Sequence, residues 1–151
     1  KRQVLPNIRD EIWLKLWGNL CFNPISALTR ATLDVVATDP ATRSLSKAMM
    51  EEAYEVATRL GASFRVDIER RINGAANVGA HRTSMLQDLE KGRAMEIDAL
   101  VSAVQELGRL GGVPTPHIDI VLGLVQQLGR SMGLYPTFPE MAPVEERMAV
   151  V

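Results

Sequence analysis

Several features that define particular classes of protein are scarce or missing in this sequence. A single cysteine, Cys21, cannot form an internal disulfide, so the chain is not a disulfide scaffold. The 17 basic and 18 acidic residues leave a net charge of −1, so there is no cationic surplus of the kind that binds nucleic acid or anionic membranes. No apolar run has the length of a membrane-spanning helix or a secretory signal. We therefore expect a cytoplasmic protein with neither nucleic acid nor membrane among its partners.

The pattern of apolar residues predicts helices and no strands. Aromatic residues make up only 5% of the chain, and β-branched residues nowhere alternate with polar ones over the length of a strand. Apolar residues recur instead at helical spacing, and 46% hydrophobic residues in 151 are enough for one core. We predict an all-α, multi-helix domain over residues 1–134, followed by an extended tail over 135–151.

Prolines, glycines and capping residues indicate where helices begin and end. A first helix is expected from Arg9 to Phe22, where Pro24 interrupts it, with a short helical piece from Pro24 toward Ala31. The further expected helices run from Asp39-Pro40 to Gly61, from Asp67 to about Ala76, from Thr83 or Ser84 to near Gly92, from about Ile97 to Gly111, and from Pro116 to Gly133. The residues expected to face inward on three of them are Leu45, Met49, Val56 and Leu60; Ile97, Leu100, Val101, Val104, Leu107 and Leu110; and Ile118, Val121, Leu122, Val125 and Leu128.

The first helix is apolar around nearly its whole circumference, which is typical of a buried helix. Between Ile12 and Asn23 its polar side chains are Lys15, Asn19 and Asn23, four residues apart, so they share one face over about 12 Å. This stripe is either a solvated edge or the wall of a cleft. In a cleft, an ammonium group can stabilise and protonate a developing oxyanion, and two carboxamides can orient a substrate. Gly18, beside Lys15, would let another group approach the backbone closely.

A second group of candidate residues lies between His81 and Asp98. From spacing alone, Ser84 is placed like a helix cap. Glu96 is placed in the first turn of the next helix, where a carboxylate complements the helix dipole. Both residues therefore also have a purely structural interpretation.

Together, the two regions follow a specific order. The fragments are Lys15-x3-Asn19-x3-Asn23-Pro24, Ser84-Met85-x-Gln87-Asp88, Glu96-Ile97-Asp98 and Gly112-Val113-Pro114-Thr115-Pro116. This order resembles the C-terminal domain of the ketopantoate reductases (2-dehydropantoate 2-reductases) over about residues 4–130. The resemblance implies a helical domain similar to that of 6-phosphogluconate dehydrogenase, packed against an N-terminal dinucleotide-binding domain. It also implies NADPH-dependent reduction of a small 2-oxo acid, ketopantoate to pantoate in pantothenate biosynthesis, or the reaction of a paralogue.

The resemblance also implies roles for individual residues. Lys15 would be the general acid that protonates the substrate carbonyl oxygen. Asn19 and Asn23 would bind substrate oxygens, and Ser84 would bind the substrate carboxylate. Glu96 would lie near the nicotinamide ribose and the lysine, and a nearby carboxylate favours the protonated form of a lysine.

Two positions depart from the family pattern. Leu33 stands where these enzymes usually have a further substrate-binding asparagine, and Val101-Ser102 stands where Asn-Gly is common. Another branched or larger 2-oxo acid is therefore an alternative substrate.

No Gly-x-Gly-x-x-Gly is present in this sequence, so nothing in it predicts a pyrophosphate cradle. We expect NADPH to be bound mainly by an N-terminal domain that is absent from this chain, and the chain alone to be inactive. The alternative hypothesis is a helical dimerisation or interaction module without catalysis of its own. In that module Trp13, Trp17 and the last helix would supply the contact area. A homodimer is compatible with both hypotheses.

The remaining chemically versatile residues have structural interpretations. His81 and His117 lack ligands at metal-binding spacing, so we expect no metal site. Cys21 is expected to be a small buried hydrophobic residue, and Trp13 and Trp17 to pack in a core or at a domain interface. The run Glu69-Arg70-Arg71 is expected to be an exposed helical face.

Overall fold

The computed structural model describes residues 8–136. Its elements are α1 (Ile8–Thr29), α2 (Leu33–Thr38), α3 (Pro40–Arg59), α4 (Ile68–Asn77), α5 (Ser84–Glu90), the π-helix η1 (Asp98–Ser102), α6 (Ala103–Gly111) and α7 (Pro116–Ser131). No residue between 8 and 136 lies in a strand, so the predicted all-α fold is confirmed. Of the predicted tail, residues 137–151 lie outside the described residues. Tyr135, at its start, is packed: its hydroxyl donates to Asp98 over 2.6 Å.

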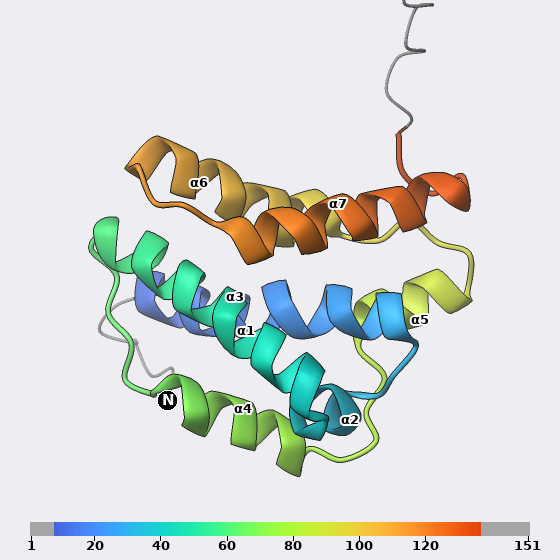
Figure 1. Cartoon of the computed structure of the whole chain (residues 1–151), viewed down its shortest axis with the longest axis horizontal. Coiled ribbons are helices and arrows are strands. Elements are labelled where there is room, and N and C mark those ends of the chain that lie inside the picture. The colour runs from blue at the N-terminus through green and yellow to red at the C-terminus, as the bar shows by residue number, and fades with distance from the viewer. Residues whose placement is uncertain (1–7, 137–151) are drawn as a thin grey trace, which may run out of the picture.

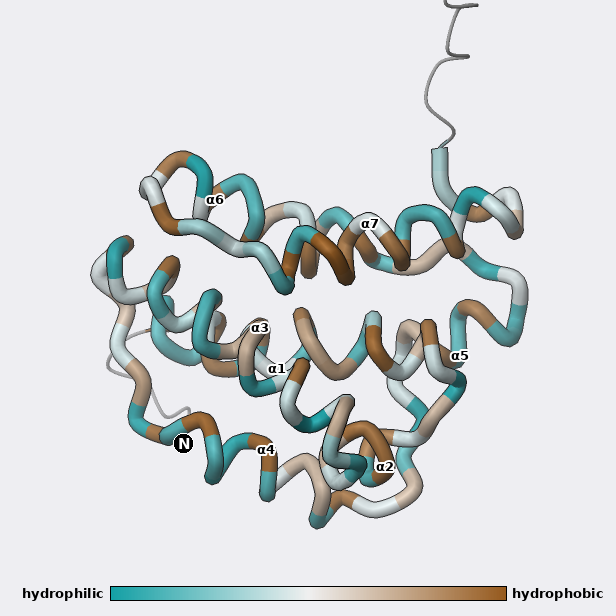
Figure 2. The backbone as a smooth tube through the Cα atoms, viewed as in Figure 1, coloured by the Kyte–Doolittle hydropathy of each residue, from teal (hydrophilic) through white to brown (hydrophobic). Residues whose placement is uncertain are grey.

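The central element of the fold is α1. It contacts α2, α3, α5, η1 and α7. Figure 1 shows α6 and α7 on one side of α1 and α3, with α2 and α4 on the other. Hydrophobic segments of α7 turn toward α1 and α3 in Figure 2. The largest fully buried side chains are Trp17, Leu20, Ile25, Met49, Met50, Ile72, Met85, Leu86, Leu89, Ile97, Ile118 and Val36. Among the described helices, none combines the length and hydrophobicity needed to cross a membrane.

The prediction that Pro24 interrupts the first helix is wrong. Instead, α1 continues through Pro24 to Thr29 as one helix. A proline inside a helix costs about 3 kcal/mol, because it removes one backbone hydrogen bond and crowds the preceding turn. Phe22 and Ile25, on either side of it, are 3% and 2% exposed. Burying two such side chains contributes about 1.5–3 kcal/mol each, which offsets the cost of the proline.

Most of the other predicted helix boundaries are confirmed. The Asp39 carboxylate accepts hydrogen bonds from the backbone N–H groups of Ala41 and Thr42, at 3.0 and 3.1 Å, and so caps α3. Asp67 caps α4 by accepting from Arg70 over 2.7 Å. The short α2 is an addition to the sequence-based expectations, because six residues are too few to show a helical period.

Two residues that were predicted to face inward are exposed. Leu60 is 39% exposed because it lies one residue beyond the end of α3. Leu110 is 78% exposed. Residues 98–102 form a π-helix, which inserts more residues per turn than an α-helix and shifts the face that the following residues present. Val104 and Gly108 consequently lie inward on α6, and Leu110 lies outward.

The start of α7 is capped by a carboxylate from α3. Glu52 accepts hydrogen bonds from the backbone N–H groups of His117 and Ile118, at 2.9 and 3.0 Å. The same carboxylate lies 2.6 Å from Nδ1 of His117. These bonds hold α7 against α3 on the side of the core.

We expect Glu52→Ala to lower the free energy of unfolding by about 1–2 kcal/mol, because two backbone donors at a helix N-terminus lose their acceptor. Urea denaturation followed by circular dichroism measures this change. The matched control is Glu51→Ala, at an adjacent and exposed residue. It should change the free energy by no more than about 0.5 kcal/mol. Equal losses in the two variants would contradict the capping role of Glu52.

Candidate functional site

The polar side of α1 leads into a pocket of about 340 Å³. The residues that line this pocket are Asn19, Phe22, Asn23, Leu33, Arg71, Ala75, Val78, His81, Thr83 and Ser84. Three of the five predicted site residues, Asn19, Asn23 and Ser84, therefore come together in one place.

The three polar residues of α1 become progressively more buried along the helix. Lys15 is exposed, Asn19 is half-buried and Asn23 is only 6% exposed. At the buried end, Nδ2 of Asn23 donates to Oγ of Ser84 over 3.5 Å, although 61 residues separate the two in sequence. The stripe is thus neither a fully solvated edge nor a fully enclosed one, because it runs from the surface into the pocket.

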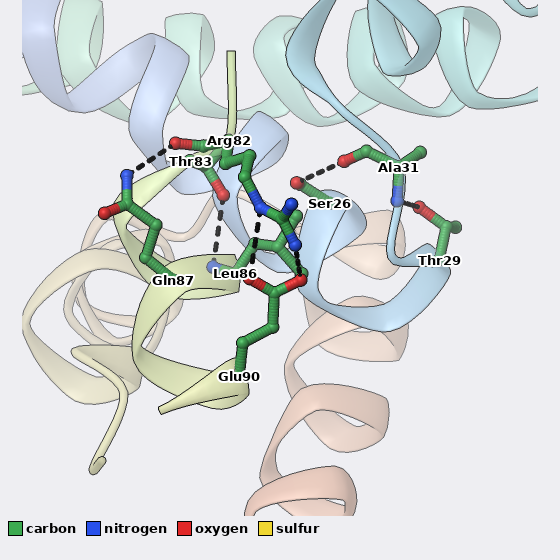
Figure 3. A network of polar contacts seen from close by, with 8 residues as sticks. All are labelled: Ser26, Thr29, Ala31, Arg82, Thr83, Leu86, Gln87 and Glu90. Atoms are coloured by element: carbon green, nitrogen blue, oxygen red, sulfur yellow. Dashed lines mark hydrogen bonds and ion pairs between the residues drawn. The ribbon is translucent and has the colours of Figure 1, made fainter. Parts of the chain in front are cut away.

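A local network at the start of α5 determines where the Ser84 hydroxyl lies. Thr83, rather than Ser84, caps α5. Its hydroxyl accepts from the Leu86 N–H over 3.3 Å (Figure 3). Arg82 forms an ion pair with Glu90, and Gln87 donates to the Arg82 carbonyl over 2.9 Å. With the cap supplied by Thr83, the Ser84 hydroxyl is left to contact Asn23.

Hydrogen bonds at the C-terminal end of α1 and just beyond it position the opposite wall of the pocket. Ser26 donates to the Ala31 carbonyl over 2.6 Å, and Ala31 donates to the Thr29 hydroxyl (Figure 3). The Leu33 N–H then donates to the carbonyl of His81 over 2.8 Å. This link joins the start of α2 to the segment before α5, so that Leu33 and His81 line the same pocket.

Lys15 and Glu96 do not line this pocket. Lys15 is exposed one helical turn before Asn19 on the same face of α1. Glu96 is exposed and precedes η1, so the prediction that it lies in the first turn of that helix is wrong. Neither side chain forms an ion pair or hydrogen bond with another residue of the described range 8–136. The structure therefore does not bring all five predicted residues into one hollow.

Arg71 is a pocket residue that the sequence analysis missed. We predicted an exposed face for Glu69-Arg70-Arg71, which is correct for the first two residues and wrong for Arg71, whose side chain is half-buried. A signal was available in the spacing. Arg71 is three residues after Ile68 and four before Ala75, so it shares the inner face of α4 with them.

Close packing of the Arg71 guanidinium against α1 depends on Gly18. A β-carbon at Gly18 would lie 2.7 Å from Cζ of Arg71, closer than two such atoms can approach. The guanidinium carbon also lies 5.9 Å from the centroid of the Phe22 ring. The close approach to the backbone that Gly18 was expected to permit is therefore made by Arg71.

Trp13, Trp17 and Cys21 belong to the core. Trp13 is 6% exposed, and Trp17 is fully buried and donates from its indole nitrogen to the Met50 carbonyl over 2.7 Å. The expectation that these two tryptophans supply contact area for a partner is therefore wrong. Cys21 is fully buried, and its burial raises the pKa of the thiol to about 12. It is not an activated nucleophile.

A second hollow, of about 530 Å³, lies on the side of α3 and α4. Its lining includes Tyr54 and Phe64, whose rings pack together at 5.3 Å between centroids. The Lys47 ammonium in this lining is already paired with Glu69 at 2.9 Å. No predicted site residue lines this hollow, so it is the weaker candidate.

The described residues show neither a metal site nor a nucleotide cradle. No group of three or more His, Cys, Asp or Glu side chains between residues 8 and 136 is placed to hold a metal ion. The glycines with positive φ in that range are Gly61, Gly79, Gly92, Gly112 and Gly133, and each follows a helix. A dinucleotide cradle needs a glycine-rich turn between a strand and a helix, so these residues do not fit a bound pyrophosphate.

Comparison with known proteins identifies the fold and the family. Residues 7–129 match the family model described as "Ketopantoate reductase PanE/ApbA C terminal". Over 132 residues, 87% of this chain and 40% of the relative, the sequence is 60% identical to a 2-dehydropantoate 2-reductase from Mesorhizobium japonicum.

Two solved structures show the same arrangement of helices. A PanE/ApbA family ketopantoate reductase from Ralstonia eutropha JMP134 matches with a TM-score of 0.80 and 26% identity, over 85% of this chain and 44% of that one. A dimeric ketopantoate reductase from Staphylococcus aureus matches with a TM-score of 0.71 and 25% identity, over 85% and 46%.

These matches define the chain as a helical domain of the kind that the ketopantoate reductases contain. It belongs to the ketopantoate reductase family, and the matched part is the family's C-terminal domain. The chain spans about two-fifths of the length of the Mesorhizobium relative.

We expect Cys21 to resist alkylation by iodoacetamide at pH 8 in the folded protein. The thiolate is the reactive form, and with a pKa of about 12 it makes up only about one part in ten thousand of the thiol at that pH. Mass spectrometry before and after unfolding in urea measures the modification, which should become complete only in urea. Stoichiometric labelling of the folded protein within minutes would contradict the burial of Cys21.

Proposed function

We propose that this chain is the substrate-binding and proton-donating domain of a cytoplasmic, NADPH-dependent reductase of 2-oxo acids. The substrate is 2-dehydropantoate or another branched 2-oxo acid. The observation that carries this proposal is the convergence of Asn19, Asn23 and Ser84 on one pocket. These are the residues to which the family resemblance gives substrate contacts.

The pocket residues supply complementary hydrogen-bonding groups. The carboxamides of Asn19 and Asn23 both donate and accept hydrogen bonds, so they can hold the oxygens of a 2-oxo acid in one orientation. Ser84 contributes a hydroxyl at the far side of the pocket. The pocket lining contains no carboxylate, so it does not repel an anionic substrate.

Lys15 is the proton donor in this proposal. It lies one turn from Asn19 on the same face of α1, beside the pocket and still accessible to other parts of a longer protein. Its ammonium group would stabilise the negative charge that develops on the substrate carbonyl oxygen and then protonate that oxygen. NADPH, when bound, supplies the hydride. Because the described residues lack a cradle for it, we assign its binding to an N-terminal dinucleotide-binding domain, with Glu96 near the nicotinamide ribose.

The apolar part of the pocket bears on the choice of substrate. Leu33 lies in the lining together with Phe22, Ala75 and Val78. This wall can accommodate the hydrocarbon branch of a 2-oxo acid and offers no hydrogen bond to a hydroxyl on it. A branched 2-oxo acid without the hydroxyl of ketopantoate is therefore the alternative substrate.

A non-catalytic interaction role is the second candidate function. Ile120 and Leu124, one turn apart on α7, are 62% and 55% exposed. The Staphylococcus aureus relative is dimeric. We propose that a homodimer would use this face of α7, which leaves the pocket of the reductase open.

In the full-length protein, we expect Lys15→Ala to lower kcat for NADPH-dependent reduction of 2-dehydropantoate by about 10²- to 10⁴-fold, because a general acid is lost. KM should change much less, since the proton transfer belongs to the transition state. Steady-state kinetics measure both. Lys91→Ala, at another exposed lysine, is the matched control and should leave kcat unchanged. A decrease of only a few fold in Lys15→Ala would refute the general-acid role.

A further inference from the structure

Arg71 differs in its surroundings from four arginines of the domain that pair with a carboxylate. Arg43, Arg65, Arg82 and Arg93 each form an ion pair with an aspartate or glutamate. Arg71 forms no such pair and no side-chain hydrogen bond with another residue of the described range. It is also half-buried, whereas its neighbour Arg70 is exposed.

Leaving a half-buried guanidinium without an anion is energetically unfavourable, because the charge loses water and gains no partner. The groups around Arg71 compensate only in part. The Phe22 ring, 5.9 Å from the guanidinium carbon, provides a cation–π contact but no negative charge. The nearby Cys21 thiol stays neutral, because its burial raises its pKa to about 12. The Arg71 guanidinium would therefore be stabilised by an anion, and the described residues do not supply one.

Arg71 lines the pocket, so an anion bound there could pair with it. Arg71 and His81 are the basic side chains of the lining, which contains no acidic one, and the arginine is always charged. Its planar group with parallel N–H donors matches the two oxygens of a carboxylate. The carboxamides and the hydroxyl of the same pocket are neutral.

We propose that Arg71 binds the carboxylate of the 2-oxo acid together with Ser84, which lines the same pocket, and that Gly18 is required because it leaves space for the guanidinium beside α1. This inference rests on the proposed function, and it adds a specificity-determining residue to the reductase site. It predicts that the substrate must carry a carboxylate at this end of the pocket. The 2-oxo group then faces Asn19 and Asn23, and the branch faces the apolar wall.

The test is steady-state kinetics of the full-length protein with 2-dehydropantoate and NADPH. Arg71→Met should raise KM for the 2-oxo acid by about 10- to 100-fold, the effect of losing a charge-assisted hydrogen bond. KM for NADPH should not change. Arg70→Met is the matched control, one residue away and exposed, and should leave both values unchanged.

Two further measurements separate carboxylate binding from a structural role. The amide of 2-dehydropantoate, which is uncharged, should be reduced equally slowly by the wild-type protein and by Arg71→Met. A structural defect in Arg71→Met would instead lower its activity toward both the acid and the amide. Gly18→Ala should also raise KM for the acid, because its methyl group would displace the guanidinium. Thermal stability should be maintained, since alanine is favoured over glycine inside a helix.

The outcomes distinguish the two proposals. If the wild-type protein reduces 2-dehydropantoate and Arg71→Met changes its KM by less than twofold, Arg71 is not the carboxylate-binding residue, while the proposed function stands. A raised KM for NADPH with an unchanged KM for the 2-oxo acid would mean that Arg71 serves the nucleotide instead, and that result too would overturn the assignment. If the wild-type protein reduces no 2-oxo acid, the proposed function fails, and the role of Arg71 fails with it.

Discussion

The burial of α1 from Trp17 to Ala27 is the constraint on which the other features of the domain depend. Five elements pack around this helix, and its core residues keep it continuous through Pro24. A helix enclosed in this way has few places for polar side chains. Asn19 and Asn23 are on the side of α1 that faces the pocket, between α4, α2 and the start of α5. The pocket is therefore a direct result of how α1 is packed.

The same packing explains why a positively charged group is found beside the amides. The inner face of α4 carries Ile72 and Ala75 into the core, and Arg71 lies on the edge of that face. Gly18 has no side chain, so the Arg71 guanidinium can lie against α1. Two amides, a hydroxyl, a guanidinium and an aliphatic wall together suit a small organic anion with a hydrocarbon branch.

The fold could largely be predicted from the sequence, because most of its helices have clear signals at both ends. Asp39-Pro40 and Asp67 form the predicted caps, and Gly112 and Gly133 follow α6 and α7 with positive φ. The continuation through Pro24 could not be predicted. Local rules give the cost of a proline but not the tertiary burial that offsets it. The π-helix at residues 98–102 also has no periodic signal, so the outward position of Leu110 was missed.

The site was predicted in part. The spacing of Asn19 and Asn23 on one helix is a local property, and Ser84 came from the family resemblance. Arg71 was missed because a run of charged residues usually indicates a solvent-exposed face, and because its partner in packing, Gly18, is 53 positions away in the sequence. Pairings of this kind depend on tertiary structure. Glu96 and Lys15 do not line the pocket, and the roles proposed for them involve the dinucleotide-binding domain of the proposed function.

The most direct measurement is a crystal structure of the full-length protein with pantoate, the expected product, bound. The ligand should lie in the pocket of α1, within hydrogen-bonding distance of Asn19, Asn23 or Ser84. A ligand bound instead in the hollow beside Tyr54 and Phe64, with the pocket of α1 filled only by solvent, would contradict the assignment of the substrate site.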